Sequence, residues 1–197
     1  MDLTAHLLSA GWASGVNAYL TVAMLSALGR AGAVEVPEPL TSDGVLIVSV
    51  AMSVIEFVAD KIPYLDNTWD VIHTLIRPAI GSVLGVEFAG QQGLDSRDEA
   101  LAGGTSGSVA LASHAVKAGL RLGINASPEP VSNIFASLTE DGLVAAVTAF
   151  SLEQPELAAA IAILLLVAGI ALVILVWTRI RRAWRAMRER WGRSPPR

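Results

Sequence analysis

One stretch of this sequence limits the fold more than any other: the twenty residues from Ala158 to Trp177 carry no charge. At about 1.5 Å of rise per residue, a helix of this length crosses the ~30 Å hydrocarbon core of a bilayer. Pro155 and Glu156 come just before it, and a missing N–H group and a negative charge both suit the first turn of a helix. The sequence therefore predicts a membrane-spanning helix at residues 156–178.

Arginine dominates the residues that follow this stretch. Eight of the 14 basic residues lie in residues 179–197, whereas 17 of the 18 acidic residues come earlier. Because segments rich in Lys and Arg stay on the cytoplasmic side of a membrane, we expect this tail to be cytoplasmic.

The apolar residues of the tail follow helical spacing and are Ile180, Trp184, Met187 and Trp191. Such a tail is either a simple orientation anchor or a helix that lies on the membrane surface with its apolar side down. On the surface, its arginines contact anionic lipid headgroups. The arginines expected to do so are Arg181, Arg182, Arg185 and Arg188.

The composition agrees with a membrane protein. The chain of 197 residues is 53% hydrophobic and 16% charged, below the roughly 25% of charged residues in a soluble domain. An acidic body joined to a basic tail does not indicate a nucleic-acid-binding protein. Without cysteine, the chain has no disulfide, thiolate metal site or cysteine nucleophile.

Six hydrophobic segments predict an all-α integral membrane protein. They cover residues 4–29, 42–61, 67–87, 98–121, 131–150 and 156–178. The third and fifth contain charged residues, so each either spans the membrane or turns back as a re-entrant helix shielded by its neighbours. If both span or both turn back, the N- and C-termini are expected in the cytoplasm, on the inner face of a bacterial inner membrane. We divide the chain into a transmembrane helical bundle, residues 1–178, and a basic cytoplasmic tail, residues 179–197.

Residues 42–90 and 98–150 resemble two versions of one plan, which makes an internal duplication a candidate. In each, a helix with charges on one face leads to a turn that contains proline and then to a second charged helix. A shorter echo relates Asn17 to Asn125, because each follows a glycine by two positions. Transporters often contain repeats and bind their substrate where the repeats meet. Two apolar hairpins also resemble each other by chance.

Ionisable side chains recur within these segments at helical spacings of three or four residues, so that sets of them share one helix face. They are Glu56, Asp60, Lys61, His73, Arg77, His114, Lys117 and Arg121. A charge within a membrane span costs on the order of several kcal/mol unless it pairs with another charge or lines a wet cavity. The acidic and basic faces therefore either hold the bundle together as structural ion pairs or form a pathway for ions or protons.

We predict a small transporter or channel that moves an ion or small solute through a polar cavity within the membrane. The lining is expected to consist of the eight ionisable residues together with Asn17, Asn125 and Asn133. The alternative is a non-transporting scaffold, or a lipid-interacting protein, whose buried charges are structural pairs. The expected partner is the lipid bilayer, and a homo-oligomer is compatible with the sequence.

No catalytic, cofactor-binding or metal site is expected. Residues 104–107 resemble the short GxSG element of rhomboid proteases, and His114 lies on the same predicted helix. Eight residues separate Ser106 from His114, about 12 Å along the axis, which is too far for a nucleophile and its base. No spacing of Asp, Glu and His indicates a metal site. We therefore do not expect an enzyme.

Three motifs stand out from the hydrophobic background. They read Glu56-Phe-Val-Ala-Asp60-Lys61-Ile-Pro63-Tyr64, Trp69-Asp70-x-x-His73-Thr74-x-x-Arg77-Pro78 and Ser127-Pro128-Glu129-Pro130-x-Ser132-Asn133. With them, the chain resembles the small bacterial membrane proteins catalogued as domain of unknown function 4126. The resemblance covers most of residues 10–178 and excludes the tail. It implies a membrane location and no particular activity.

Overall fold

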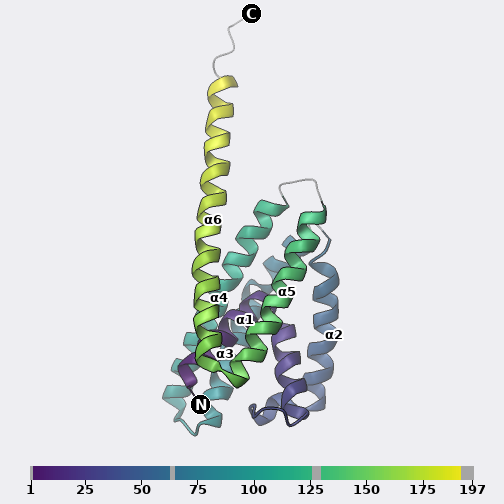
Figure 1. The fold of residues 1–197 in the computed structure, drawn as a ribbon, viewed down its shortest axis with the longest axis vertical. Coiled ribbons are helices and arrows are strands. Elements are labelled where there is room, and N and C mark those ends of the chain that lie inside the picture. The colour runs from purple at the N-terminus through teal and green to yellow at the C-terminus, as the bar shows by residue number, and fades with distance from the viewer. Residues whose placement is uncertain (1, 63–64, 126–129, 192–197) are drawn as a thin grey trace, which may run out of the picture.

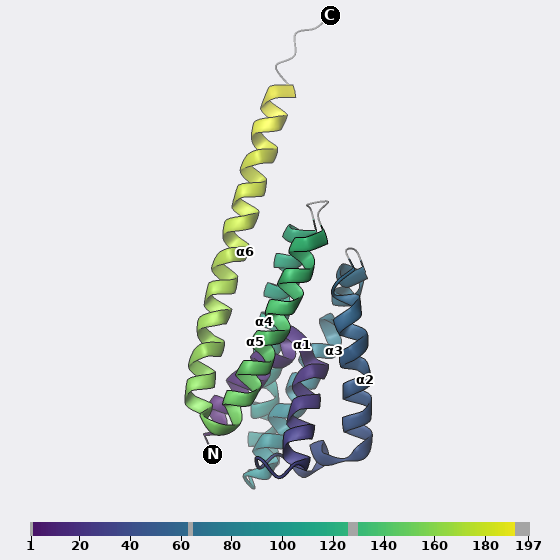
Figure 2. The same cartoon turned by 45° about the vertical axis from the view of Figure 1, so that its right-hand side comes forward.

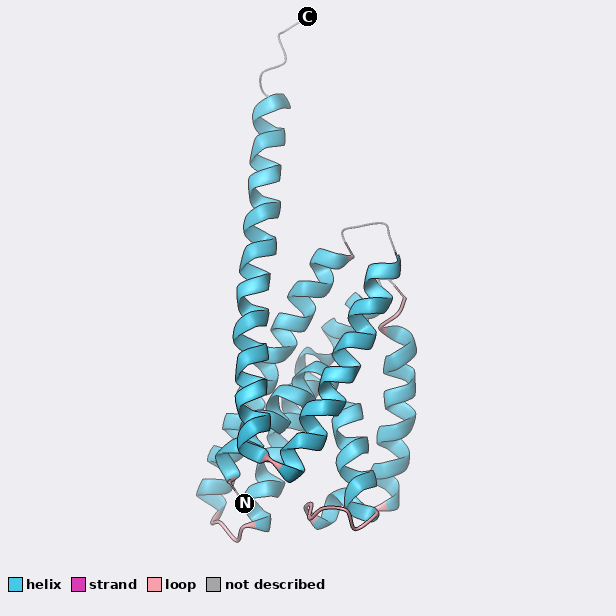
Figure 3. Cartoon of the chain, viewed as in Figure 1, coloured by secondary structure: helices cyan, strands magenta, loops and turns pink. Residues whose placement is uncertain are grey.

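Six long helices and one short 3-10 helix make up the computed structural model (Figure 1), which describes residues 2–62, 65–125 and 130–191. They are α1 (Leu3–Arg30), η1 (Glu38–Thr41), α2 (Asp43–Ala59), α3 (Leu65–Gln91), α4 (Ser96–Ile124), α5 (Pro130–Glu153) and α6 (Pro155–Trp191). The described residues contain no strand, as the colouring of Figure 3 shows. The prediction of an all-helical protein is confirmed, although residues 127–129 of the third motif lie outside the described residues.

Three helices within the described part of the chain are long and apolar enough to cross a membrane. They are Leu65–Gln91, Val131–Glu153 and Pro155–Glu189. The first two contain the predicted segments 67–87 and 131–150, each of which was expected either to span the membrane or to turn back as a re-entrant helix. Each forms a continuous helix along the bundle (Figure 1), and α3 stays helical through Pro78.

The bundle is apolar on its outside and charged in its centre. Leu75 and Phe135 are 81% and 72% exposed, whereas Glu56 and Arg77 are 0% exposed. In water, such a surface is unfavourable and fully buried charges are rare. Lipid tails cover an apolar surface at no such cost, so this pattern indicates a membrane protein.

The path of α1 differs from the expected straight span. Its backbone leaves the helical conformation at Asn17, with φ −147° and ψ 95°. Figures 1 and 2 show the chain entering at the end marked N, turning inside the bundle and returning to that end. The packing agrees, because Ala10 and Leu25 lie in one apolar cluster with Phe88. Fifteen residues of continuous helix would separate them by about 22 Å.

The first hydrophobic segment is therefore a pair of half-helices that turns back inside the bundle, and each half is about 20 Å long, shorter than a ~30 Å hydrocarbon core. The five helices α2 to α6 run along the bundle, so the end marked N and the end of α6 lie at opposite ends (Figure 2). This differs from the expectation of both termini on one side. That expectation assumed a first segment that crosses.

The two ends of the bundle differ in charge. We call one the acidic end, because the connections there, residues 31–43, 92–95 and 153–156, are rich in Asp and Glu. We call the other the arginine end, where α2 and α4 finish and α6 continues beyond the bundle with its arginines (Figure 1). Each of the pairs α2–α3 and α4–α5 runs from the acidic end to the arginine end and back. An internal duplication stays a prediction, because antiparallel hairpins arise without one.

Small residues allow the first half of α1 to pack directly on α4. A Cβ atom at Gly11 would lie 2.7 Å from the backbone oxygen of Ser106. A Cβ atom at Gly15 would collide with the Ser113 hydroxyl and with the Ala110 carbonyl. Backbones that approach this closely are typical of membrane helices with small residues at their contacts.

Gly15→Ala is therefore expected to lower the free energy of unfolding by about 1–3 kcal/mol, because its methyl group pushes α1 away from α4. The matched control is Gly104→Ala, where a Cβ atom would meet no described atom within 4 Å. Unfolding in detergent, followed by circular dichroism, measures both. Equal stability of the two variants would contradict the close contact.

Candidate functional site

Buried charges occupy the centre of the bundle, next to the break in α1. We call this set the ionic network; it consists of Glu56, Asp60, Asp66, Asp70, Arg77, Lys117, Arg121 and Glu140. Seven of these residues are at most 3% exposed, and the Glu140 side chain is 18% exposed. Buried charges of this kind persist only when they are paired and hydrogen-bonded.

Arg77 of α3 binds two carboxylates. Its Nη2 donates to Glu56 Oε1 at 2.6 Å, and its Nη1 donates to Asp70 Oδ1 at 2.9 Å. Nη1 also donates to His114 Nδ1 at 2.7 Å. Asp70 and Arg77 are seven residues apart, about two helical turns, which puts both on one face of α3. Two carboxylates therefore share one guanidinium.

Lys117 of α4 links the network to the break in α1. Its ammonium donates to Asp60 Oδ2 at 2.6 Å and to the Val16 carbonyl at 3.1 Å. Glu140 Oε2 lies 3.6 Å and Glu56 Oε1 3.8 Å from the same nitrogen. Val16 ends the first half of α1, where a helix leaves carbonyls without partners and favours a positive charge.

Asn17 shapes the break itself. Its side-chain oxygen accepts from the Leu20 N–H at 2.9 Å and so caps the second half of α1, a role that asparagine favours. Its side-chain amide donates to Asp141 Oδ1 of α5 at 3.0 Å. The residue therefore connects the turn in α1 to α5.

Arg121 extends the network toward the arginine end. Its Nε and Nη2 donate to the two oxygens of Glu140 at 3.1 Å and 2.6 Å, a bidentate pair. Its Nη1 donates to Asn133 Oδ1 at 2.5 Å and to the Asp60 carbonyl at 3.1 Å. Asn133 donates to that carbonyl as well, at 3.1 Å.

Two of the predicted residues lie at the edge of the network. The Asn125 amide donates to both oxygens of Asp66 at 2.9 Å. Lys61 donates to the Ser137 hydroxyl at 3.2 Å, and its ammonium is 3.9 Å from Asp141 Oδ2. The structure thus connects Asn125 to the network through both oxygens of Asp66, and Lys61 to the neighbouring polar groups through Ser137 and Asp141.

The hydrogen bonds of the two histidines define their tautomers. Arginine only donates, so His114 Nδ1 accepts from Arg77 and Nε2 carries the proton. His73 Nδ1 lies 2.7 Å from the Trp69 carbonyl and donates to it, and His73 Nε2 accepts from the Tyr19 hydroxyl at 3.0 Å. His73 therefore joins Tyr19 and Trp69, whereas His114 belongs to the group around Arg77.

Four acidic residues of this region were absent from the predicted lining: Asp66, Asp70, Glu140 and Asp141. Each is a charge within or next to a hydrophobic segment, so the signal was present in the sequence. The backbone acceptor at Val16 had no such signal, because it exists only where α1 breaks.

The serine of the GxSG sequence lies in a close contact between helices. Among the described residues, no group of three or more His, Asp or Glu side chains is arranged to hold a metal ion. Ser106 of the GxSG sequence is buried where α4 meets Gly11 of α1 and Gly81 and Gly85 of α3. Its place in a close helix contact fits a packing role.

Two hollows in the described surface are lined by residues outside the ionic network. A groove of about 450 Å³ between α1, α2 and α3 is lined mostly by apolar side chains and reaches Tyr19. A second hollow lies at the acidic end, beside Glu38, Glu87 and Glu99. Seven of the residues expected to line a polar cavity contact one another: Glu56, Asp60, Arg77, His114, Lys117, Arg121 and Asn133.

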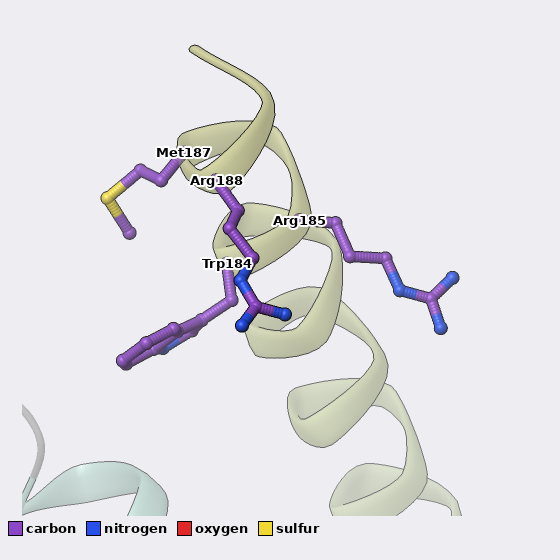
Figure 4. Close-up of a pocket in the computed structure, with 4 residues that line it drawn as sticks. All are labelled: Trp184, Arg185, Met187 and Arg188. Atoms are coloured by element: carbon purple, nitrogen blue, oxygen red, sulfur yellow. The ribbon is translucent and has the colours of Figure 1, made fainter. Parts of the chain in front are cut away.

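A further hollow lies on the exposed continuation of α6. It is lined by Trp184, Arg185, Met187 and Arg188, which project from a single helix (Figure 4). Trp184 and Met187 are 68% and 53% exposed. Because α6 is continuous from Pro155 to Trp191, residues 179–191 leave the bundle along the helix axis (Figure 1).

Lys117→Met is expected to destabilise the protein by about 3–5 kcal/mol, because it leaves Asp60 as a buried charge without its closest partner. The double variant Lys117→Met/Asp60→Asn should recover much of this loss. Denaturant unfolding in detergent measures all variants. Arg30→Met is the control, since its pair with Asp43 is exposed and contributes about 0–1 kcal/mol. A double variant no more stable than Lys117→Met would contradict the pairing.

Comparison with known proteins gives one match. The family model described as Domain of unknown function (DUF4126) matches residues 5–175. No curated protein and no solved structure matches the chain. The matched range contains α1 to α5 and the apolar part of α6, so it includes every residue of the ionic network. The chain belongs to the family of domain of unknown function 4126.

Proposed function

We propose that the protein binds small cations in the ionic network and moves them across a membrane. The observation that carries this proposal is an excess of buried acid. In the described residues of the network, four carboxylates that are at most 3% exposed accompany three cations that are equally buried. The acids are Glu56, Asp60, Asp66 and Asp70, and the cations are Arg77, Lys117 and Arg121. Such a site attracts positive charge.

Unused acceptor atoms support the same function. Among the described residues, three of these carboxylates each have one buried oxygen without a hydrogen-bond partner. The atoms are Glu56 Oε2, Asp60 Oδ1 and Asp70 Oδ2. Buried polar atoms without partners are uncommon, and each asks for an explanation such as an absent water or ion.

The broken helix supports transport over a purely structural role. Transporters place their binding sites near mid-membrane, where discontinuous helices leave backbone groups free to bind. Here the break at Asn17 brings the Val16 carbonyl to Lys117 of the network. In this proposal the directly paired charges correspond to an occluded state of the transporter. We propose no enzymatic activity for this site.

We place the arginine end in the cytoplasm, following the rule that Lys and Arg remain inside. The membrane is then the inner membrane of a bacterium, with α2 to α6 crossing it. The acidic end and the start of α1 face the opposite side, since α1 returns to the end where it began.

Flux into liposomes tests the proposal. Reconstituted protein is expected to pass protons, Na⁺ or K⁺ faster than protein-free vesicles under an imposed potential. Glu56→Gln should lower this flux by about tenfold or more, because it removes a buried charge of the site. Glu153→Gln, at the acidic end, is the matched control and should keep the flux. Flux of all three ions at the protein-free rate would overturn the proposal.

A scaffold function is the second candidate, and a specific observation favours it. The charged side chains contact one another directly, with N–O distances of 2.6–2.9 Å, as in structural ion pairs. In this case the wild-type protein folds and shows no flux, while single charge removals still destabilise it. The liposome experiment together with the unfolding experiment separates the two candidates.

For the tail we propose contact with anionic lipid headgroups. The arginines Arg181, Arg182, Arg185 and Arg188 follow the apolar part of α6 and lie on its exposed continuation. An arginine near an anionic membrane surface contributes about 1 kcal/mol. The tail also serves as an orientation anchor in this arrangement.

Replacing these four arginines by glutamine is expected to abolish a preference for anionic lipid. The measurement is the unfolding temperature in detergent after addition of phosphatidylglycerol or phosphatidylcholine. Wild-type protein should be stabilised more by phosphatidylglycerol, and added salt should reduce the difference. An equal response of wild type and variant would contradict the contact.

A further inference from the structure

We infer that the group formed by Glu56, Arg77 and Asp70 carries one exchangeable proton, and that the cation this protein moves is the proton. This inference rests on the proposed function and names its substrate. Both carboxylates contact the same guanidinium, at 2.6 Å and 2.9 Å. All three side chains are at most 4% exposed.

Two of the three buried cations of the network each pair with one carboxylate. Arg121 pairs with Glu140 in a bidentate contact, and Lys117 pairs with Asp60 at 2.6 Å. These pairs are one to one at their shortest distances. Arg77 is the exception, because one positive charge faces two acids.

Asp66 is the other acid of the network that does not form a close pair with a cation. Asp66 lies in the first turn of α3, where a helix favours negative charge. It accepts two hydrogen bonds from Asn125 and one from the Asn67 backbone N–H, and it lies 3.7 Å from Arg121. This carboxylate is therefore compensated as an anion.

The uncompensated negative charge thus belongs to Glu56 and Asp70. An ionised carboxylate without a counter-charge is very costly in an apolar interior, and the usual outcome is protonation. Two carboxylates that share one site behave in this way, since one of them retains its proton. Each has one buried oxygen without a partner in the described structure, Glu56 Oε2 and Asp70 Oδ2, where a proton can reside.

A metal cation fits this position less well than a proton. No group of three or more Asp, Glu or His in the described residues is arranged to hold a metal ion. The charged neighbours also oppose a second cation, because Lys117 lies 3.8 Å from Glu56 and Arg77 contacts both acids. A proton needs only one oxygen lone pair.

The proton resides on a carboxylate and not on His114. The Nδ1 lone pair of His114 already accepts from Arg77. The other ionisable groups around the two acids are Lys117 of α4, Asp60 of α2, Tyr19 of α1, His73 of α3 and, beyond Lys117, Glu140 of α5. Of these groups, Lys117 and Asp60 pair with each other, and His73 pairs with Tyr19.

Infrared spectroscopy of the full-length protein in H₂O and D₂O tests this assignment, because a protonated carboxyl has a C=O stretch that an ionised one lacks. Wild-type protein is expected to show a protonated carboxyl that shifts in D₂O. Glu56→Gln and Asp70→Asn should each abolish that band, because the remaining acid then pairs one to one with Arg77. Glu153→Gln is the control and should retain it.

Chemical labelling of the wild type decides the matter if either variant fails to fold. Dicyclohexylcarbodiimide adds to a protonated carboxyl: the carboxyl oxygen bonds to the central carbon and the carboxyl proton moves to nitrogen, and the adduct rearranges to a stable N-acylurea. Peptide mass mapping should find this adduct on Glu56 or Asp70, with equal yield in sodium, lithium and choline chloride. Protection by sodium or lithium would indicate a metal cation and overturn the inference.

Absence of the carboxyl band and of the adduct from wild-type protein would also overturn the inference, as would a band that persists in both amide variants. These outcomes are separate from those of the flux experiment. Sodium flux without a protonated carboxyl would support transport and contradict the proton as the transported cation. A protonated carboxyl without any ion flux would retain the bound proton and reject transport.

Discussion

Full charges in the centre of an apolar bundle must find partners inside the bundle, and here the partners come from different helices. Lys117 of α4 bonds to Asp60 near the end of α2 and to the Val16 carbonyl of α1. Arg121, one turn further along α4, bonds to Glu140 of α5. Because each of these bonds joins two elements, the charge pairs place α1, α2 and α5 around α4. The charge pairs therefore connect α1, α2 and α5 to α4 across the interior of the bundle.

The break in α1 and the network stabilise each other. In a continuous helix the Val16 carbonyl would accept from the N–H of residue 20. Here the Leu20 N–H is bound by the Asn17 side chain, and the carbonyl is free to accept from Lys117. Removing the ammonium would leave a buried carbonyl without a partner, and straightening the helix would leave the ammonium without one of its two closest acceptors. The re-entrant shape and the buried lysine therefore form one structural unit.

Hydrophobicity predicted the helices well, because each segment is long and its apolar character is a local property. The positions of the six helices agree with those expected to within about four residues, except that α6 continues to Trp191, beyond the expected end at residue 178. Pairing of an acidic helix face with a basic one was one of the two interpretations of the charge spacing, and the structure brings Glu56 and Asp60 to Lys117. Asp70 was missed as a partner of Arg77, although their separation of seven residues gives a shared helix face.

The break was not predictable from local sequence, because its cause is distant. Pro78 is the strongest helix breaker within a predicted segment, yet α3 continues through it. Asn17 has no such local signal, and its extended backbone is supported by Asp141 of α5 and, through Val16, by Lys117, 101 residues from that carbonyl. Long-range contacts of this kind decide between a span and a re-entrant helix, which also sets the side on which the chain begins.

The three buried cations differ in how readily they can change partners. Arg77 binds two acids, and Arg121 binds both oxygens of Glu140. Each does so through a rigid planar group, so its movement would break several hydrogen bonds at once. Lys117 has a flexible stem and a single close carboxylate, Asp60, with Glu140 and Glu56 at 3.6 Å and 3.8 Å as neighbours. Its ammonium can pass from one acid to another without losing all negative partners. In a protein that moves protons through this network, Lys117 is therefore the group whose displacement costs least, and its departure from Val16 would release the break in α1.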